Sequence, residues 1–340
     1  MSDKAASSAK DAFDVALVPG ARTALREVYS RLRNAEEDFY AEMAGKSSEG
    51  ALARVRACPL CGEDKPTAFL AARGLEIVRC ASCAHVYSRN VYTEDLDLWQ
   101  YEVADRALWT AYLEVKEHPV LVGAEARRNK YFVDICERYT RRGRMLEVGS
   151  GNGGLLYEAA QREWVVDGID PNPIWQNVQP SMGIKPRLGW FPKDLGPSER
   201  FDAISMLDVL EHMVEPVGFL KSTRPYLAPD GILFLQVPNL DSLWTRLRGA
   251  ADHNWCPSHW SYFDAAAMAR AAECAGYEIL WTETVITELD RILAMEPAEV
   301  LALANKLGHA SLSRLSEVTP AWIHAHKLGY KLISVLRPRA

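Results

Sequence analysis

The sequence contains no run that approaches the roughly 18 consecutive apolar residues needed to cross a bilayer as a helix. Its first ten residues, MSDKAASSAK, are polar and lack the apolar core of a secretory signal peptide. No internal repeat or low-complexity tract interrupts the chain. We therefore expect a cytoplasmic globular protein that has no membrane partner.

An excess of positive charge is also missing. The 340 residues include 39 Lys and Arg against 45 Asp and Glu, which gives a formal net charge of -6. Proteins that bind phosphate backbones over a wide surface usually carry the opposite balance, so nucleic acid is not the expected partner. The length, with 48% hydrophobic and 25% charged residues, indicates one large core with smaller appendages.

Cysteine is sparse, and because cytoplasmic thiols stay reduced, the seven cysteines do not indicate a disulfide framework. Four of them form two Cys-x-x-Cys pairs, Cys58 with Cys61 and Cys80 with Cys83. Two such pairs can direct four thiolates to the corners of a tetrahedron, the geometry of closed structural zinc sites. Since the segment 51–95 is short for a core of its own, we predict a structural Zn(II) module there. A redox pair and an incomplete metal site are the alternatives.

Helical patterns flank this module. Apolar positions spaced by three and four residues between 21 and 44 predict an amphipathic helix in an N-terminal segment, 1–50. The aromatic-rich segment 96–140 is expected to form a helical lid or linker. Residues 286–340 are expected to be C-terminal helices, the last at 321–340, which pack on the body or on a second subunit.

The stretch RMLEVGSGNGGLLYEAA reads as a buried strand that turns through Gly149, Gly151 and Gly153 into a helix. Glycines at such a turn let the backbone approach a ligand closely, and the helix start presents N–H donors to it. A second strand, WVVDGID, ends at Asp170, nineteen residues past Gly151, where a carboxylate can accept hydrogen bonds from ribose hydroxyls. A nucleotide-like cofactor is therefore predicted.

Two further strand patterns, FDAISML at 201–207 and GILFLQVPN at 231–239, alternate with helical segments. This alternation predicts an α/β fold with a doubly wound, mostly parallel sheet, in a domain at 141–285. Ligands of such sheets bind beyond the carboxyl ends of the strands. The site is then expected near residues 149–153, 170, 190, 207–212 and 238–240.

In this order and spacing, LEVGSGNGG, GIDPNP, FDAISMLDVLEHM and GILFLQVPN resemble the successive motifs of class I S-adenosylmethionine (SAM) dependent methyltransferases, over about residues 125–285. The form E-x-G-x-G-x-G differs from the G-x-G-x-x-G of dinucleotide dehydrogenases. The resemblance implies a Rossmann-like methyltransferase sheet that binds SAM.

The resemblance also assigns cofactor-binding residues. Gly149, Gly151 and Gly153 would line the methionine part of SAM, and Glu147 would lie at the floor of the site. Asp170 would hold the ribose, and Leu207 and Asp208 would lie beside the sulfonium. Where members of the family often place an acidic residue near the adenine, this chain has GWFP, so either Trp190 or Phe191 is expected to stack on the ring.

The four-cysteine pairs ahead of this domain and the stretch HNWCPSHWSYF, 253–263, are similar to features of the sugar C-methyltransferases and related bacterial small-molecule enzymes. In that group a Glu-His pair follows the last core motif, and its histidine is the general base. Here His259 stands at the histidine and Ser258 at the glutamate. Proton removal from carbon benefits from the missing carboxylate, so O- and N-methylation stay open beside C-methylation.

His259 is therefore the candidate general base. Glu211 and His212 are further candidate catalytic residues, with helix capping or packing as the alternative. A metal site made of His253, Cys256 and His259 has suitable ligand types but no supporting carboxylate nearby. The aromatic residues of the stretch are expected to form apolar walls around the acceptor, with core packing as their alternative.

The sequence thus predicts an enzyme of secondary or glycan metabolism that transfers a methyl group in line from SAM to a small molecule, such as a sugar or a natural-product intermediate. One alternative is an RNA methyltransferase that holds its substrate with the zinc module, which the acidic balance disfavours. The other is a non-catalytic SAM-binding regulatory protein, which the glycines and Asp170 disfavour. A homodimer is left open.

Overall fold

A sheet of seven strands forms the centre of the protein in the computed structural model, which describes residues 9–46, 54–94, 96, 106–177, 183–184 and 186–339. The strand order is β12-β13-β10-β9-β6-β7-β8. The strands are β6 Arg144–Val148, β7 Val165–Asp170, β8 Pro186–Leu188, β9 Phe201–Leu207, β10 Leu227–Pro238, β12 Tyr277–Val285 and β13 Lys331–Pro338. Strands β10, β9, β6, β7 and β8 are parallel, whereas β13 is antiparallel to both of its neighbours. The predicted doubly wound α/β sheet is confirmed.

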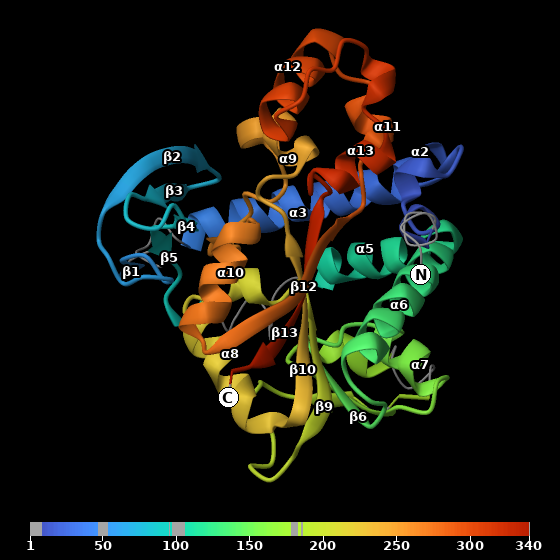
Figure 1. Cartoon of the computed structure of the whole chain (residues 1–340), viewed down its shortest axis with the longest axis vertical. Helices are drawn as coiled ribbons and strands as arrows, with labels where there is room; N and C mark the ends of the chain where they lie inside the picture. Colours follow the sequence, from blue (N-terminus) through green and yellow to red (C-terminus); the bar gives the residue numbers. More distant parts are fainter. Residues whose placement is uncertain are drawn as a thin grey trace.

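Helices cover both faces of this sheet, which explains why its strands read as nearly continuous apolar runs. Helices α6 (Pro119–Tyr139) and α7 (Gly154–Ala160) pack on one face, and α8 (Pro216–Thr223) and α10 (Ala265–Cys274) on the other (Figure 1). Successive strand residues point to opposite faces, so Met145 joins the core under α6 and Leu146 the core under α8. Each fully buried side chain of this kind stabilises the fold by about 1.5–3 kcal/mol.

The end of the chain differs from the prediction. The expected helix at 321–340 is only α13, Pro320–Ala325, and the stretch KLISVLRP forms β13 between β10 and β12. The run from Leu332 to Leu336 is buried along its whole length, as in a central strand. The prediction of a second long helix was wrong. Five consecutive buried residues fit a strand that is covered on both faces. The basic residues that flank them had been interpreted as the polar side of an amphipathic helix. The sheet therefore extends beyond residue 285.

A group of short helices lies at one end of the sheet. It consists of α9 (Leu243–Arg248), α11 (Leu289–Ile292), α12 (Pro297–Gly308) and α13, which gather at the top of Figure 1. They share an apolar cluster of their own that includes Leu243, Ile292, Val300, Ile323 and Leu328. The group is inserted after β10 and between β12 and β13, so it stands over the carboxyl end of β10.

The N-terminal helices α2 (Ala21–Ala24) and α3 (Arg26–Lys46) fall within the segment expected to be helical. Arg22 of α2 donates to Asp290 over 2.8 Å, which ties α2 to α11. Phe39 and Met43 of α3 are buried in one cluster with Trp255 and Trp260. Helices α5 (Arg106–Glu117) and α6 occupy the described part of the expected helical linker, whose residues 97–105 lie outside the described ranges. Within those ranges no helix is both long and apolar enough to cross a membrane.

The cysteine-rich segment contributes a second, four-stranded sheet. Its order is β11-β4-β3-β2, from β2 Pro66–Ala72, β3 Leu75–Cys80, β4 Val86–Ser88 and β11 Ser261–Tyr262. All neighbouring strands are antiparallel. Strand β11 belongs to the histidine-aromatic stretch, so this small sheet is completed by a segment that is distant in sequence.

Candidate active site

The glycine turn lies between β6 and α7, at the carboxyl end of the sheet. Gly149, Gly151 and Gly153 have φ values of +67°, +50° and +70°, a region that residues with a side chain rarely adopt. A Cβ atom added to Gly149 would lie 2.6 Å from Cγ2 of Val209. The turn therefore abuts the segment that follows β9, and this close approach also requires glycine.

Asp170 ends β7 beside this turn. Its Oδ2 accepts a hydrogen bond of 2.9 Å from the N–H of Gly151, and its Oδ1 accepts one of 2.8 Å from the N–H of Asn172. Burial raises the pKa of Asp170 to about 6, against the lowering effect of these two bonds. Each carboxylate oxygen has a second acceptor position, so the fixed side chain can also receive hydroxyl donors.

Glu147 lies one strand away, on β6, and is 4% exposed. Its Oε2 has no hydrogen-bond partner in the described part of the chain. Burial raises the pKa of Glu147 to about 8, although the positive charges of Arg128 and Lys116 act in the opposite direction. A buried carboxyl with an unsatisfied oxygen costs free energy, so this position suits a ligand that brings a donor or a positive charge.

The two aromatic residues after β8 differ in their surroundings. Phe191 is 8% exposed, and its ring lies 5.6 Å from the ring centroids of both Phe219 and Tyr226. It is a core residue, contrary to the expectation that either ring could face the cofactor. Trp190 is only partly buried, and its backbone N–H donates to Oδ2 of Asp194 over 2.7 Å.

Leu207 ends β9, and Asp208 follows it with a left-handed φ of +57°. The Oδ1 of Asp208 accepts from Lys331 Nζ over 2.9 Å, and its Oδ2 accepts from Gln236 over 3.0 Å. Lys331 begins β13, which was predicted as helix, so no pattern in the sequence indicated this cation at the site.

Glu211, His212 and His259 come together beyond the ends of β9 and β10. A carboxylate oxygen of Glu211 and one ring nitrogen of each histidine all lie within 4.8 Å of one another. The two imidazole centroids are 4.7 Å apart, with the ring planes at 77°. Glu211 and His212 belong to the short helix η5 (Leu210–His212), whereas His259 stands in the loop before β11. The structure therefore unites the three candidate catalytic residues.

Backbone carbonyls fix the orientation of both rings. The Nδ1 of His212 lies 3.1 Å from the carbonyl oxygen of Ser258, and the Nδ1 of His259 lies 3.0 Å from that of Asn254. A carbonyl only accepts, so each Nδ1 carries the proton and each Nε2 carries the ring's lone pair. Ser258 has a φ of +84°, a strained conformation for a residue with a side chain.

Burial controls the charge of the cluster. It lowers the pKa of His212 to about 4 and the pKa of His259 well below its ordinary value, so both rings are neutral near pH 7. Burial, together with the negative charge of Asp208, raises the pKa of Glu211. Glu211 is 1% exposed, and within the described ranges neither of its carboxylate oxygens has a hydrogen-bond partner.

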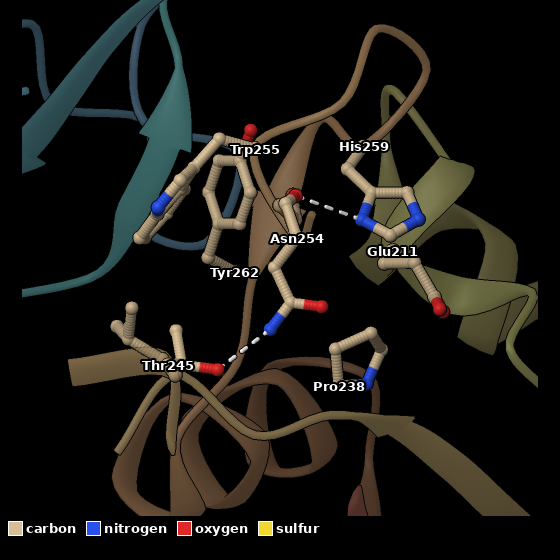
Figure 2. Close-up of a pocket in the computed structure, with 9 residues that line it drawn as sticks. Glu211, Pro238, Thr245, Asn254, Trp255, His259 and Tyr262 are labelled. Carbon is tan, nitrogen blue, oxygen red and sulfur yellow. Dashed lines mark hydrogen bonds between the residues drawn. The ribbon is translucent and has the colours of Figure 1, made fainter. Parts of the chain in front are cut away.

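A small cavity lies next to this cluster. Figure 2 shows the His259 ring above the Glu211 side chain, with the backbone oxygen of Asn254 on the other side of the ring. The amide of Asn254 donates to Thr245 Oγ1 over 3.0 Å and accepts from Tyr330 over 3.3 Å. The cavity lining comprises Glu211, Pro238, Leu240, Thr245, Asn254, Trp255, His259, Ser261 and Tyr262.

The aromatic rings of the stretch HNWCPSHWSYF are mainly packed. Trp255 and Tyr262 touch the cavity, but their rings lie 4.8 Å apart in the core. Trp260 and Phe263 are fully buried. The metal site considered for His253, Cys256 and His259 does not form. The half-exposed side chain of His253 lies near Glu36. Within the described residues, the clusters of metal-binding side chains include neither His253 nor Cys256.

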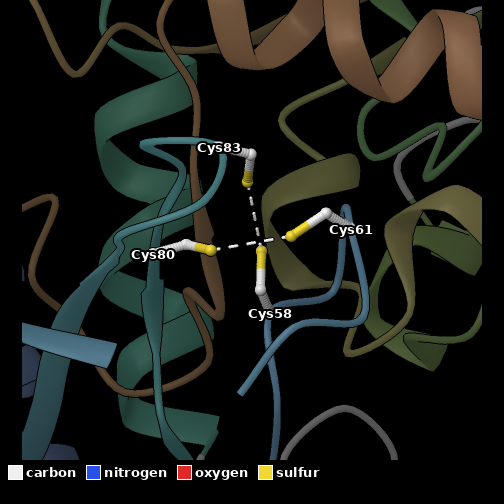
Figure 3. A group of neighbouring side chains, drawn as sticks. All are labelled: Cys58, Cys61, Cys80 and Cys83. Carbon is white, nitrogen blue, oxygen red and sulfur yellow. Dashed lines mark hydrogen bonds between the residues drawn. The ribbon is translucent and has the colours of Figure 1, made fainter. Parts of the chain in front are cut away.

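The four predicted zinc ligands lie together beside the small sheet: Cys58 and Cys61 precede β2, Cys80 ends β3, and Cys83 lies between β3 and β4. Their sulfur atoms are all within 4.8 Å of one another, and the Cys58–Cys83 and Cys61–Cys80 sulfur pairs are 3.5 Å apart. Figure 3 shows the four sulfur atoms pointing to a common centre. Zn–S bonds of about 2.3 Å in a tetrahedron require sulfur separations of roughly 3.8 Å, so the donor set and its geometry fit zinc.

The zinc module holds the loop that carries His259. Strand β11 pairs with β4 through Ser261 opposite Tyr87, and the N–H of Ser88 donates to the Trp260 carbonyl over 3.0 Å. Arg56 donates to the carbonyls of Trp260 and Val214. Arg73, at the β2–β3 turn, donates to the Trp255 carbonyl over 3.0 Å. The module therefore forms hydrogen bonds with this loop on both sides of His259 in the sequence.

Comparison with known proteins locates a family within the chain. Residues 124–281 match the sequence model of a family described as a methyltransferase domain. The ubiquinone biosynthesis O-methyltransferase of Haemophilus ducreyi is 32% identical over 111 residues, which cover 28% of this chain and 45% of that protein. The enzyme of the same description from Parvibaculum lavamentivorans is 30% identical over 124 residues, covering 34% and 46%.

The chain spans about half the length of the curated relatives it matches. Among solved structures, the plantazolicin methyltransferase BpumL in complex with SAH has a TM-score of 0.48 and 14% identity, covering 73% of this chain and 97% of that one. The family match, 124–281, includes the glycine turn, Asp170, the Glu211–His212 pair and His259, whereas the zinc ligands precede it. Residues 124–281 therefore match a methyltransferase domain, as the sequence predicted.

Proposed function

We propose that this protein is a SAM-dependent methyltransferase that transfers a methyl group to a hydroxyl oxygen of a small molecule. The observation that carries the proposal is the position of the Glu211–His212–His259 cluster, because Val209, two residues before Glu211, lies against Gly149 of the glycine turn. In-line transfer requires the donor and the acceptor to meet at such a junction.

The cofactor half of the site is assigned as follows. Asp170, already oriented by two backbone N–H groups, would accept hydrogen bonds from the ribose hydroxyls of SAM. Glu147, with its unsatisfied oxygen, would face the positively charged methionine part, which the three glycines would allow to approach. Trp190, rather than the buried Phe191, would stack on the adenine. Leu207 and Asp208 would lie beside the sulfonium, as the class I resemblance implies.

The acceptor half would be the cluster and the cavity next to it. His259 is the candidate base, because its Nδ1 proton is held by the Asn254 carbonyl and its Nε2 carries the lone pair. Its low pKa keeps it neutral, and therefore able to accept a proton, near pH 7. Glu211 and His212 would contact the same acceptor group.

Two observations favour oxygen over carbon as the methylated atom. The Nδ1 of His259 is bound by a carbonyl rather than a carboxylate, so the ring lacks the partner that would strengthen it as a base toward a C–H group. The matched curated relatives are O-methyltransferases, although this chain spans only about half of them. The zinc module, 51–95, would act as a structural support for the acceptor half, consistent with a closed four-thiolate site that leaves no position for chemistry.

Transfer of tritiated methyl groups from SAM into a fractionated extract of the source cells tests the proposal. We expect label in the low-mass fraction with the wild-type protein, and about 5- to 150-fold less with Asp170→Ala at limiting SAM. The labelled product should then resist mild acid but release its labelled methyl group on ether cleavage, as a methyl ether does. Label in nuclease-sensitive material, or none in any fraction, would contradict the proposal.

A further inference from the structure

We propose that helix α5 is a lid on the cofactor half of the site, and that Lys116 and Glu125 are positioning residues that couple this lid to the glycine turn. The part of SAM that the lid would secure is its amino-acid end, which lies beside that turn in the proposed function. The inference rests on the proposed function for the identity of the ligand. The contacts that support it belong to the protein alone.

One end of α5 is fixed to the glycine turn through a series of side chains. Lys116, in the last turn of α5, forms an ion pair with Oε1 of Glu125 on α6. The other carboxylate oxygen of Glu125 accepts a hydrogen bond of 3.4 Å from the side-chain amide of Asn152, within the glycine turn. The Oδ1 of Asn152 accepts one of 3.2 Å from the N–H of Gly154, the first residue of α7. Lys116, Glu125 and Asn152 therefore form a relay from α5 to the turn.

The same helix also packs on the segment that follows β7. The ring centroids of Tyr112 and Trp175 lie 6.1 Å apart, with the ring planes at 78°. Trp175 is 5% exposed and belongs to the short helix η3 (Pro173–Asn177), which comes after Asp170. The Nζ of Lys116 lies 5.4 Å from the Tyr112 ring centroid, so one turn of α5 makes both contacts. Helix α5, which lies between α3 and α6 in Figure 1, thus joins the two segments that flank the cofactor half.

The relay is charged and shielded from solvent. The side chains of Lys116 and Glu125 are only 22% and 16% exposed. Burial alone would raise the pKa of Glu125, but the positive charges of Lys116 and Arg128 outweigh it and hold this pKa below its usual range. The carboxylate therefore stays ionised and can accept from Asn152. Removal of one partner of such a pair leaves the other charge unpaired, so loss of Lys116 should disturb both α5 and the Asn152 side chain.

The position of the relay specifies which part of the ligand it should affect. Asn152 belongs to the glycine turn, which would line the methionine part of SAM, whereas Asp170 would hold the ribose. Lys116 and Glu125 are also close enough to influence the charge of Glu147, which would face the same methionine part. The relay should therefore matter for ligands that carry the amino-acid group. Because coupling between two sites is reciprocal, these ligands should in turn stabilise α5.

A pair of ligands tests the inference. S-adenosylhomocysteine (SAH) and methylthioadenosine both contain the adenosine and a neutral sulfur atom, but only SAH has the amino-acid group. In equilibrium titrations, Lys116→Met should weaken SAH binding about tenfold and change methylthioadenosine binding by less than about twofold. Glu125→Ala should weaken SAH binding by a similar factor, because Asn152 loses its acceptor.

Two further variants separate the relay from a general effect of charge. Lys116→Arg keeps the positive charge opposite Glu125 and should bind SAH within about threefold of the wild type. Lys130→Met removes an exposed lysine of α6 that lies outside the relay, and it should bind SAH as the wild type does. Circular dichroism and retained zinc verify that each variant is folded.

Hydrogen–deuterium exchange measures the lid itself. SAH should slow amide exchange in residues 106–117 of the wild type, and saturating SAH should no longer do so in Lys116→Met. Equal SAH affinity of the wild type and folded Lys116→Met would overturn the proposal. An equal loss for SAH and methylthioadenosine, or unchanged protection of α5 in the variant, would overturn it as well.

Neither measurement requires an acceptor, so the inference and the proposed function can fail separately. SAH binding that depends on Lys116 as expected, in a protein that transfers no methyl group, would retain the lid and contradict only the proposed function. A wild-type protein that binds neither ligand would contradict both.

Discussion

The cofactor half and the acceptor half of the site are built in opposite ways. Glu147, the glycine turn and Asp170 fall within 24 consecutive residues, on two adjacent parallel strands. The acceptor half draws on the zinc module, on η5 after β9, on the loop before β11 and on the start of β13. One half is therefore local in sequence, and the other exists only in the folded protein.

This difference has an energetic consequence. The cofactor half is supported by the central sheet, whose strands are buried on both faces. The loop with His259 is supported by β4, by the guanidinium groups of Arg56 and Arg73, and through them by the four cysteines. Damage to the zinc module should therefore affect acceptor chemistry while SAM binding persists.

Loss of a zinc ligand is expected to have the largest effect. Cys58→Ser should release the metal, whose binding free energy in isolated zinc-finger peptides is about 10–16 kcal/mol, so the zinc module should lose its structure and methyl transfer should fall below detection. Calorimetry should still find SAM affinity within about threefold of the wild type. Cys274→Ser, which changes a partly buried cysteine outside the cluster, is the matched control. Normal transfer by zinc-free protein would refute the division into two halves.

Removal of His259 should come next. His259→Ala is expected to lower kcat by about 100- to 10,000-fold, the usual range for a positioned acid–base group, with SAM affinity unchanged. Initial rates at saturating SAM, compared with those of His253→Ala, measure the effect. A change confined to the Michaelis constant for SAM would place His259 in the cofactor half instead.

Asp170→Ala should impair SAM binding by the cofactor half of the site. Loss of the carboxylate leaves the N–H groups of Gly151 and Asn172 and the ribose hydroxyls without their acceptor, which should weaken SAM binding by about 1–3 kcal/mol. Equilibrium binding of SAM tests this, with Asp167→Ala on the same strand as the control. Unchanged affinity would remove Asp170 from the cofactor site.

The pH dependence of SAM binding should report the same carboxyl group. Because burial raises the pKa of Asp170 to about 6, its carboxylate becomes protonated below that value, and SAM affinity should fall by up to about tenfold per pH unit. The stability of the SAM-free protein should change in the opposite sense, because the raised pKa favours folding at low pH and this contribution is lost as pH rises through about 6. Asp170→Asn should remove both trends, and their persistence would assign them to another group.

Trp190→Ala should have the smallest effect. Loss of one stacking ring is expected to weaken SAM binding by about 0.5–1.5 kcal/mol. The same factor should appear for adenosine, because the contact concerns only the adenine. An effect on SAM with none on adenosine would show that Trp190 does not face the base.

The sequence predicted what depends on local spacing. The glycine turn, the acid that ends β7 and the two cysteine pairs each carry a chemical signal within a few residues, and the structure brings the cysteines together as expected. The parallel strands were recognisable because burial on both faces leaves continuous apolar runs. The nearly continuous apolar run LISVL in β13 is also typical of a strand buried on both faces, but it was not recognised because the whole tail was interpreted as a helix.

The acceptor half was less predictable because backbone atoms hold it. Ser258 stands in the sequence where a glutamate is expected and lacks the carboxylate, whereas in the structure its backbone carbonyl orients His212. Every residue has a backbone carbonyl, so such a contact cannot be predicted from the amino-acid type at that position. Lys331 and Asn254 were likewise missed, because only the tertiary fold brings them to Asp208 and His259.

The position of β13 also dictates the order in which the molecule can be completed during synthesis. In the described part of the chain, strand β12 bonds to the central sheet only through β13, which lies between it and β10. The edge of the sheet that is formed by β12 and β13 therefore stays incomplete until residue 338 has left the ribosome, and Lys331 cannot reach Asp208 before then. The Asp208–Lys331 bond of the acceptor half can therefore form only after β13 has been synthesised.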